Sequence, residues 1–259
     1  MTMSLLVHFR NRLVLSAMAG INDHRFCSKF PVALAILGGF SADDKSMRAG
    51  MKVVKRGRKE FIFSNPLEGI RGEVVNLLSA FSGQFAINVR SFSDEGYIKA
   101  ARLAAMYGGI VEINAHCRQP EFKEIGCGEE LLRDTDRLSS IVERTSKVCI
   151  TAVKIRGNVE GVRYRELISA LKDAGCHIIH VDAMIPGGDA DFELVRKVSS
   201  RIFTIGNNSV DGKAKARKML DSGASLVSAA RAVLRDENFF HTLLTDERLS
   251  GEVWLRVNV

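Results

Sequence analysis

The sequence predicts an α/β protein, a (β/α)₈ barrel of the TIM type, from three observations. Short apolar runs of strand length recur along the 259 residues, and many are followed by a segment with helical spacing. The runs end in polar or glycine-bearing loops, as the carboxyl ends of barrel strands do. The alternation repeats about eight times, which predicts a parallel sheet, and at this chain length a closed barrel is the expected form of that sheet.

The apolar runs follow one another in the order expected of the barrel strands. They cover residues 13–17, 32–37, 85–89, 110–113, 148–153, 177–181, 202–205 and 225–228. Between the later runs, apolar residues at helical spacing predict the intervening helices. These helices are expected over residues 94–106, 128–145, 161–174, 189–199 and 212–222.

The domain organisation follows from the absence of any linker-like or low-complexity segment, so residues 1–259 are expected to form a single barrel domain. Residues 41–83 are longer than an ordinary connection and are interpreted as an elaboration over the barrel mouth. Within it we expect two helices and a hairpin, at residues 43–50, 66–81 and 51–63 respectively. Residues 236–259 are expected to form a short helix and a tail that closes the outside or pairs with a partner.

Composition and cysteine usage predict a cytoplasmic globular protein. Hydrophobic residues make up 46% of the chain and charged residues 26%, which suits a sizeable core. The five cysteines are scattered, odd in number and without CxxC spacing, so a disulfide framework or a metal site is not expected. The apolar N-terminus is interrupted by charged residues before it reaches the length of a membrane span. Oligomeric state is left open, and a homo-oligomer is compatible with the sequence.

The net charge of +7 and the pI near 9.3 favour an anionic partner. The densest basic run is KVVKRGRK at residues 52–59. Such a run is more often a solvated face than a nucleic-acid site, and no aromatic residue is interleaved to stack on bases. RNA therefore stays open as a partner on charge alone.

Polar residues are expected to gather at the carboxyl ends of the strands. Lys154 and Arg156 have the same parity as Ala152, so they are expected to face the barrel axis at its mouth. By the same reasoning other polar residues converge on this rim, namely Glu112 with Asn114, His180 with Asp182, and Met18, Asn88 and Asn207. Stability alone does not require so many polar groups there, which indicates a functional site.

The stretch from Gly108 to Asp134 carries the strongest chemical signal in the chain. A buried strand ends at Asn114 and opens into a loop that holds Cys117, before a glycine turn leads onward. A thiol at the end of a barrel strand lies where such barrels keep their chemistry. On its own, however, a cysteine in a loop is more often a small half-buried residue than a catalytic one.

Several motifs resemble those of tRNA-dihydrouridine synthases and the related dihydroorotate dehydrogenase-like flavin barrels. The family patterns are APMAGVTDxxFR, INxGCPxxxxxxxGxGxxLLxD, VKxRxG, IGNGD and IGRGAL. The matching segments here are LSAMAGINDHRF (15–26), INAHCRQPEFKEIGCGEELLRD (113–134), VKIRG (153–157), IGNN (205–208) and SAARAVL (228–234). They occur in the family's order and span nearly the whole chain.

The resemblance implies FMN as the cofactor and assigns residues to hold it. Ala17 and Met18 would lie against the flavin ring, and Asn88 takes the place of a family glutamine that bonds it. Lys154 would sit at the edge of the ring where a fixed cation stabilises the reduced anion. The remaining cofactor contacts that the resemblance assigns are Asn114, Asp182, Gly206, Asn207, Ala230 and Arg231, of which the last four would hold the phosphate.

The resemblance also implies the reaction. Cys117 takes the position of the family's catalytic acid, and a thiol is largely protonated at neutral pH and can donate a proton. Together with Lys154 it would serve hydride transfer between the flavin and a pyrimidine C5=C6 bond, with NADPH or another reductant as electron donor. Asn114 and Arg156 would contact the substrate, by family either tRNA uridine or a free pyrimidine.

Three departures from the family pattern leave alternatives. Asp182 replaces a flavin-contacting histidine, and Ala230 replaces a glycine of the phosphate loop. About 25 residues follow Leu234, too few for the C-terminal helical domain with which the synthases grip tRNA. A dihydroorotate dehydrogenase-like enzyme acting on a small molecule, and a barrel without flavin that serves as a binding protein, are therefore alternatives to the synthase-like reading.

Overall fold

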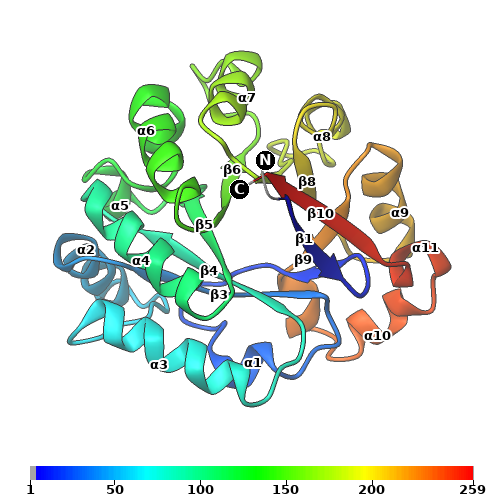
Figure 1. The fold of residues 1–259 in the computed structure, drawn as a ribbon, viewed down its shortest axis with the longest axis horizontal. Coiled ribbons are helices and arrows are strands. Elements are labelled where there is room, and N and C mark those ends of the chain that lie inside the picture. The colour runs from blue at the N-terminus through cyan, green and yellow to red at the C-terminus, as the bar shows by residue number, and fades with distance from the viewer. Residues whose placement is uncertain (1–3, 259) are drawn as a thin grey trace.

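The computed structural model describes residues 4–258, and its centre is a closed barrel of parallel strands (Figure 1). Neighbouring strands follow one another in sequence, and the last of them pairs with the first to close the barrel. The barrel strands are β2 (Leu13–Leu15), β3 (Leu34–Ser41), β4 (Gln84–Arg90), β5 (Ile110–Ala115), β6 (Ile150–Arg156), β7 (Ile178–Asp182), β8 (Phe203–Asn207) and β9 (Leu226–Ala229). The (β/α)₈ barrel predicted from the sequence is confirmed.

The helices surround this barrel (Figure 1). They are α1 (His24–Cys27), α2 (Asp44–Lys55), α3 (Pro66–Leu78), α4 (Asp94–Met106), α5 (Pro120–Lys123), α6 (Thr135–Ser146), α7 (Tyr164–Asp173), α8 (Phe192–Ser199), α9 (Lys213–Asp221), α10 (Phe239–Leu244) and α11 (Glu247–Ser250), with 3₁₀ turns η1 (Gly128–Leu132) and η2 (Arg231–Leu234). Within residues 4–258 no helix is long and apolar enough to cross a membrane.

Side-chain caps fix where several helices begin. The carboxylate of Asp43 accepts a hydrogen bond from the backbone N–H of Ser46 at the start of α2, and Asp191 does the same for α8. The hydroxyl of Ser93 caps α4, whose bounds agree with the predicted helix at 94–106. The sequence does not predict α1, α5 and α11, because each has only four residues.

Two local predictions are wrong. The hairpin expected over residues 51–63 is not formed, because α2 continues to Lys55 and buries Met47, Gly50 and Val53 at helical spacing. The single helix expected over 128–145 is divided into η1 and α6. The side chain of Asp134 caps a new helix there by accepting from the N–H of Arg137.

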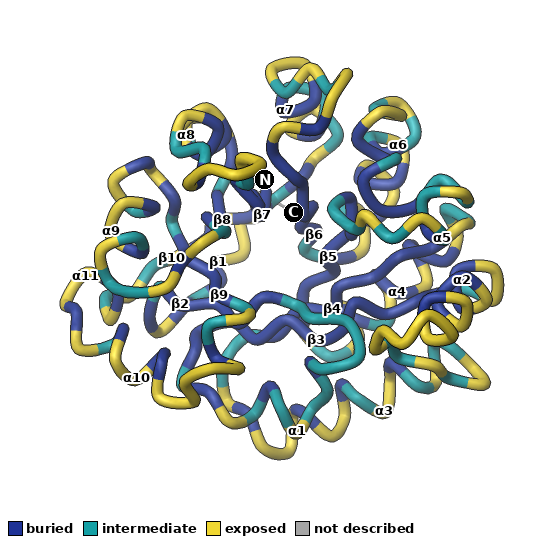
Figure 2. Tube along the Cα trace, turned by 180° about the vertical axis from the view of Figure 1, so that it is seen from behind, coloured by how far each residue is buried: buried dark blue, intermediate teal, exposed yellow. Residues whose placement is uncertain are grey.

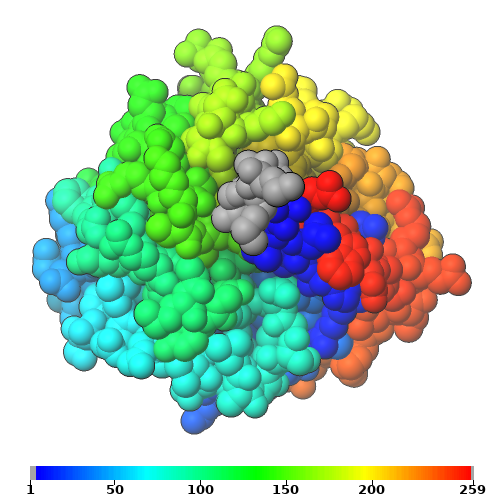
Figure 3. All heavy atoms as spheres, in the orientation of Figure 1, coloured from blue at the N-terminus to red at the C-terminus, as the bar shows by residue number. Residues whose placement is uncertain are grey.

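The two ends of the chain close the amino-terminal end of the barrel. Strand β1 (Ser4–Phe9), which the sequence analysis does not predict, pairs antiparallel with β10 (Val253–Asn258). Figure 3 shows these segments, in blue and red, side by side over this face. Val7 and Phe9 of β1 and Leu255 and Val257 of β10 pack on the apolar barrel interior. The C-terminal tail was expected to close the outside of the barrel or to pair with a partner. Its strand β10 instead closes the amino-terminal end of the barrel together with β1.

Burial follows the layers of the fold. Figure 2 shows that the barrel strands are buried, whereas the helices expose their outer sides. A large apolar cluster fills the layer between strands and helices, and a smaller one fills the lower barrel interior above β1 and β10. What remains for function is the opposite, carboxyl end of the barrel, its mouth.

Candidate active site at the barrel mouth

A layer of polar side chains lies inside the barrel directly above its apolar floor. Ala86, Ala152 and Ile178 belong to that floor, and on each of their strands the next inward residue, two positions on, is polar. The residues of this layer are Ser16, Asn88, Glu112, Lys154, His180 and Ser228, none more than 4% exposed. Because burying unpaired polar groups is costly, their contacts define what the layer can do.

A continuous chain of hydrogen bonds crosses the barrel. The carboxylate of Glu112 lies 2.6 Å from His180 Nδ1 and accepts from Asn88 Nδ2, also at 2.6 Å. His180 Nε2 lies 2.7 Å from Ser228 Oγ, which accepts in turn from Asn207 Nδ2 at 2.5 Å. Burial opposes the charge of Glu112, but His180 and Lys154 outweigh it and lower the pKa of this carboxyl. Burial lowers the pKa of His180, so a neutral ring donating to an ionised Glu112 satisfies the whole chain.

Lys154 lies beside this chain of hydrogen bonds. Its Nζ atom lies 2.5 Å from Ser16 Oγ, and within residues 4–258 no carboxylate lies within ion-pair distance of it. Burial lowers the pKa of Lys154, while the more distant carboxylates of Glu112 and Asp182 oppose this decrease. A buried ammonium without a direct counter-ion can stabilise an anionic group brought to the mouth.

The Cys117 loop is held in place by its neighbours. The side-chain oxygen of Asn114 accepts from the backbone N–H groups of His116 at 3.1 Å and Cys117 at 2.9 Å. The carbonyl of Cys117 accepts from the N–H of Glu129 at 3.0 Å. Gly128 has φ of 67°, and a Cβ atom there would collide with the Cys117 carbonyl, so the glycine turn is required for this contact. Asn114 therefore serves chiefly to shape the loop of the thiol.

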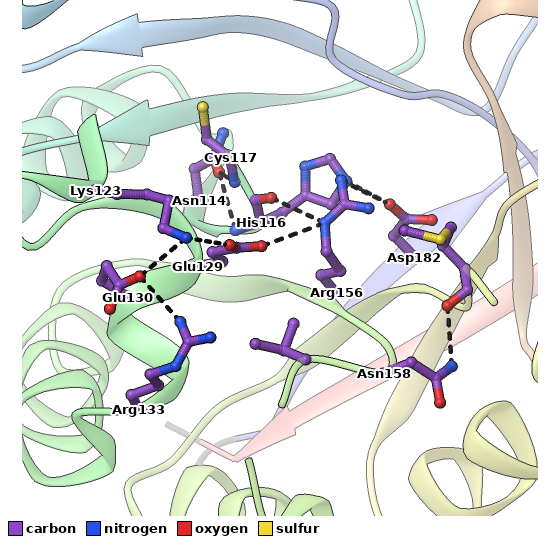
Figure 4. A network of polar contacts seen from close by, with 12 residues as sticks. Asn114, His116, Cys117, Lys123, Glu129, Glu130, Arg133, Arg156, Asn158 and Asp182 are labelled. Carbon is purple, nitrogen blue, oxygen red and sulfur yellow. Dashed lines mark hydrogen bonds and ion pairs between the residues drawn. The ribbon is translucent and has the colours of Figure 1, made fainter. Parts of the chain in front are cut away.

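A second network of charges lies along the rim, as Figure 4 shows. His116 Nε2 lies 2.5 Å from Asp182 Oδ2 and 2.9 Å from Arg156 NH2. Arg156 also contacts Asp182 at 3.4 Å and Glu129 at 3.8 Å, and Glu129 accepts from Lys123 at 2.8 Å. The negative charge that Asp182 brings to the mouth is thus countered on the rim itself.

The titration of this rim pair follows from its surroundings. Burial lowers the pKa of His116 to about 4 even though a quarter of its side chain is exposed, with Asp182 opposing and Lys154 adding to the decrease. Burial would raise the pKa of Asp182, but the hydrogen bond from His116 and the nearby Arg156 lower it to about 2. At neutral pH the pair consists of a neutral imidazole and a carboxylate.

The ion pair between Arg90 and Glu60 was not expected from the sequence. The guanidinium of Arg90 lies 2.5 Å (NH2) and 3.2 Å (NH1) from the two carboxylate oxygens of Glu60, and its NH1 lies 3.7 Å from Cys117 Sγ. Burial opposes the charge of Arg90, but Glu60 outweighs it and raises the pKa of the guanidinium above its ordinary value. Arg90 has the parity of Asn88, which would have placed it at the mouth, whereas no local signal marks Glu60 in its loop.

The predicted phosphate residues lie around the ends of β8 and β9. A Cβ atom at Gly206 would come within 3.0 Å of Met219 Sδ, so this glycine allows α9 to pack closely. Asn207 points inward to Ser228, and Ala230 and Arg231 begin η2, with Arg231 exposed. These segments also carry backbone features that suit an anion: positive φ at Asn208 and Ser209 and the start of α9, which has no capping side chain.

The residues present fit a phosphorylated flavin, the group implied by the sequence resemblance. Ala17 and Met18 are half-buried after β2, on the same rim as Lys154, and could cover the ring. The uncapped start of α9 and the residues after β9 could hold the phosphate. Asn88 already uses its oxygen on Asn114 and one amide hydrogen on Glu112, which leaves its second amide hydrogen for a ligand.

A surface cavity of about 620 Å³ lies apart from this mouth, between α7 and α8. Its lining includes Tyr164, Arg165, Leu194 and Arg201. The Tyr164 hydroxyl in it donates to the carbonyl of Arg156 and accepts from the N–H of Val159, so its hydrogen bonds are used within the fold. The groups with perturbed charge chemistry gather at the mouth instead, which makes the mouth the candidate active site.

Comparisons with known proteins agree with the fold and name no activity. No protein-family model matches the chain. A curated protein of Methanocaldococcus jannaschii, "Uncharacterized protein MJ0144", is 33% identical over 237 residues, which cover 86% of this chain and 90% of that protein. The solved structure of a FabK (M276A) mutant from Thermotoga maritima has a TM-score of 0.56 at 12% identity, covering 87% of this chain and 62% of FabK. This chain thus spans about three fifths of FabK, and the likeness concerns the barrel fold.

Proposed function

Because this chain belongs to the family of the uncharacterized protein MJ0144 of Methanocaldococcus jannaschii, whose name states no activity, we propose its function from its own barrel mouth. The function is that of a flavin-dependent oxidoreductase that transfers hydride between FMN and a pyrimidine C5=C6 bond. The observation that carries it is the buried side-chain nitrogen of Lys154 at the carboxyl end of the barrel, which bonds Ser16 and, among residues 4–258, lies within ion-pair distance of no carboxylate.

The chain supplies a binding site and a proton donor for this reaction. When bound, FMN supplies or accepts the hydride. Lys154 stabilises negative charge at the flavin edge, and the segments after β8 and β9 bind the phosphate. Cys117 donates the proton to the substrate carbon, and its loop follows β5, the strand next to β6, on which Lys154 pairs in register with Asn114.

The charges of the mouth favour a neutral substrate ring. Arg90 is paired with Glu60, and Arg156 with Asp182 and Glu129. Lys154 is assigned to the cofactor, so these buried cations leave no free charge for a substrate carboxylate. This favours a uracil-type ring over a substrate like dihydroorotate, which carries a carboxylate.

The basic segment beside the mouth favours RNA as the carrier of that ring. Residues 44–59, which form α2 and the loop after it, hold seven basic residues and one acidic residue, a net charge of +6 out of the chain's +7. All seven basic side chains are exposed. On its other side α2 packs through Ala49 and Val53 against the segment that carries Cys117. A polyanion bound to α2 would therefore lie close to the thiol.

The first test is the visible absorption spectrum of protein purified without added cofactor. Bands near roughly 370 and 450 nm, with FMN released on heating, are expected. A substrate screen then compares short uridine-containing RNA with free uracil and dihydroorotate, with Cys117→Ala as the inactive control. A colourless protein that does not bind added FMN would refute the flavin enzyme.

RNA binding is measured separately from colour. Binding to RNA should weaken steeply with salt, and a Lys52→Gln/Lys55→Gln variant should bind more weakly, while a Lys172→Gln/Lys197→Gln variant with changes on α7 and α8 should not. A colourless protein that still binds RNA in this way would favour the second candidate, a binding protein built on the barrel.

A further inference from the structure

The geometry points to Arg90 and Glu60 as positioning residues that hold the Cys117 thiol and govern its reactivity. The pair comes from two segments far apart in sequence, the end of β4 and the loop between α2 and α3. This inference rests on the proposed function for the step it serves, but neither the contacts nor the test requires flavin.

The guanidinium of Arg90 is fixed from several directions. Its NH2 donates to the carbonyl of Gly39 at 2.7 Å and to Glu60 at 2.5 Å, and the Phe122 ring lies against it at 3.8 Å. The side chains of Arg90 and Glu60 are 2% and 4% exposed. The remaining contact of NH1, beyond Glu60, is Cys117 Sγ at 3.7 Å. The guanidinium is therefore held in one orientation, in which its NH1 group faces the Cys117 thiol.

Stability is a weak reason for keeping such a pair. Removing both charges of a buried ion pair from water is expensive, and apolar residues of similar size often do as well or better. Here the guanidinium bonds the Gly39 carbonyl through NH2, but its NH1 also contacts a thiol, that of Cys117. A purely structural ion pair would not need this contact with a thiol.

Other charged groups near Cys117 are already engaged or lie outside. The ring of His116 turns away to Asp182, and Arg118 is exposed. The other ionisable groups around the thiol are Lys123, Cys127, Glu129 and Arg156. Of these, Lys123 and Arg156 both contact the carboxylate of Glu129, and the Cys127 thiol donates to the carbonyl of Ser91. Arg90 is the cation in hydrogen-bond contact with the sulfur.

The pair serves proton donation by the thiol. When Cys117 gives its proton to the substrate carbon, the S–H bond breaks, a C–H bond forms and the electron pair remains on sulfur as a thiolate. Arg90 stabilises that thiolate. Glu60 limits this effect before the reaction, because its carboxylate offsets the positive charge that the guanidinium presents to the sulfur.

Alkylation of Cys117 by iodoacetamide tests this on the full chain without substrate. The rate is followed by peptide mass from pH 5.5 to 9, and the other four cysteines are buried. Glu60→Gln should react about tenfold faster near pH 6.5, with its pH profile moved to lower pH. Glu60→Gln/Arg90→Met, which lacks both charges, should react more slowly than Glu60→Gln by at least about tenfold.

The matched control is Glu68→Gln, which removes a carboxylate from the exposed face of α3. It should leave the alkylation profile unchanged. Equal profiles for wild type, Glu60→Gln and Glu68→Gln, or slower reaction of Glu60→Gln, would overturn the inference. If the double variant does not fold, the comparison of Glu60→Gln with wild type still decides.

The flavin content of the same preparations reports on the proposed function. A colourless protein that does not bind added FMN, but whose Cys117 still responds to Glu60→Gln, would keep this inference and refute the flavin enzyme. A coloured protein whose Cys117 does not respond to Glu60→Gln would support flavin binding and overturn this inference.

Discussion

The Nζ atom of Lys154 lies 2.5 Å from Ser16 Oγ, so the middle of β6 and the residue after β2 meet across the barrel interior. Lys154 pairs in register with Asn114 on one side and His180 on the other. The ammonium thus stands between the strand that leads to Cys117 and the strand that carries the buried histidine. The proposed function assigns this group to the edge of the flavin.

We expect Lys154→Met to weaken FMN binding by at least about tenfold, because a fixed cation at the flavin edge is lost. The unfolding midpoint without flavin should not fall, since a buried ammonium lacking a direct counter-ion is not a source of stability. Quenching of flavin fluorescence and urea unfolding measure the two effects. Lys147→Met, on the surface after α6, is the control, and FMN binding by Lys154→Met at wild-type affinity would contradict the assignment.

The hydrogen-bonded chain of side chains from Glu112 to Ser228 should contribute strongly to the free energy of unfolding. Glu112→Ala leaves His180 and Asn88 without their acceptor and is expected to cost about 3–5 kcal/mol, whereas Glu112→Gln should cost less. Urea unfolding at pH 7 measures both. Glu95→Ala, at an exposed position of α4, should change stability by less than about 0.5 kcal/mol. A cost for Glu112→Ala below about 1 kcal/mol would show that water replaces the hydrogen bonds that the carboxylate of Glu112 makes.

The floor formed by β1 and β10 should stabilise the barrel through its inner face alone. Phe9 is fully buried against the interior, so Phe9→Ala is expected to cost about 3–5 kcal/mol. Trp254 is 54% exposed and stacks on His8, so Trp254→Ala should cost less than about 1 kcal/mol. Thermal unfolding compares the two variants, and similar costs would mean that the outer face is covered by a further contact.

Acid should destabilise the protein partly through His116. Its pKa is lowered from 6.5 to about 4, so between these values the unfolded chain binds a proton that the folded chain does not. The free energy of unfolding therefore falls as pH decreases through this window, while Asp182, with a pKa of about 2, remains ionised.

From pH 7 to 4.5 the wild type should lose about 2 kcal/mol more than His116→Gln, measured by urea unfolding at both values. His241→Gln, at an exposed position on α10, is the control and should follow the wild type. Parallel losses in wild type and His116→Gln would show that this imidazole is protonated in the folded protein.

Much of the barrel could be predicted because its signals are local. Apolar runs and helical spacing identify strands and helices one at a time, and the cap at Ser93 marks the start of α4. Parity along a strand also places Lys154 above Ala152 and His180 above Ile178, on the inner face. In residues 51–63 the local pattern was ambiguous, so the helix predicted at 43–50 was ended too early and its last turn was assigned to a hairpin.

By itself, then, the sequence determined the fold class, the order of its strands and the inward parity of residues such as Lys154 and His180, because each of these depends on neighbours along the chain. Tertiary structure alone decided which side chains meet: Arg90 with Glu60, His116 with Asp182, and β1 with β10. These partners lie from 30 to more than 240 residues apart, and no local pattern specifies them. They are chosen by closure of the barrel, which brings segments from distant parts of the chain together, where buried polar groups need partners and apolar faces need cover.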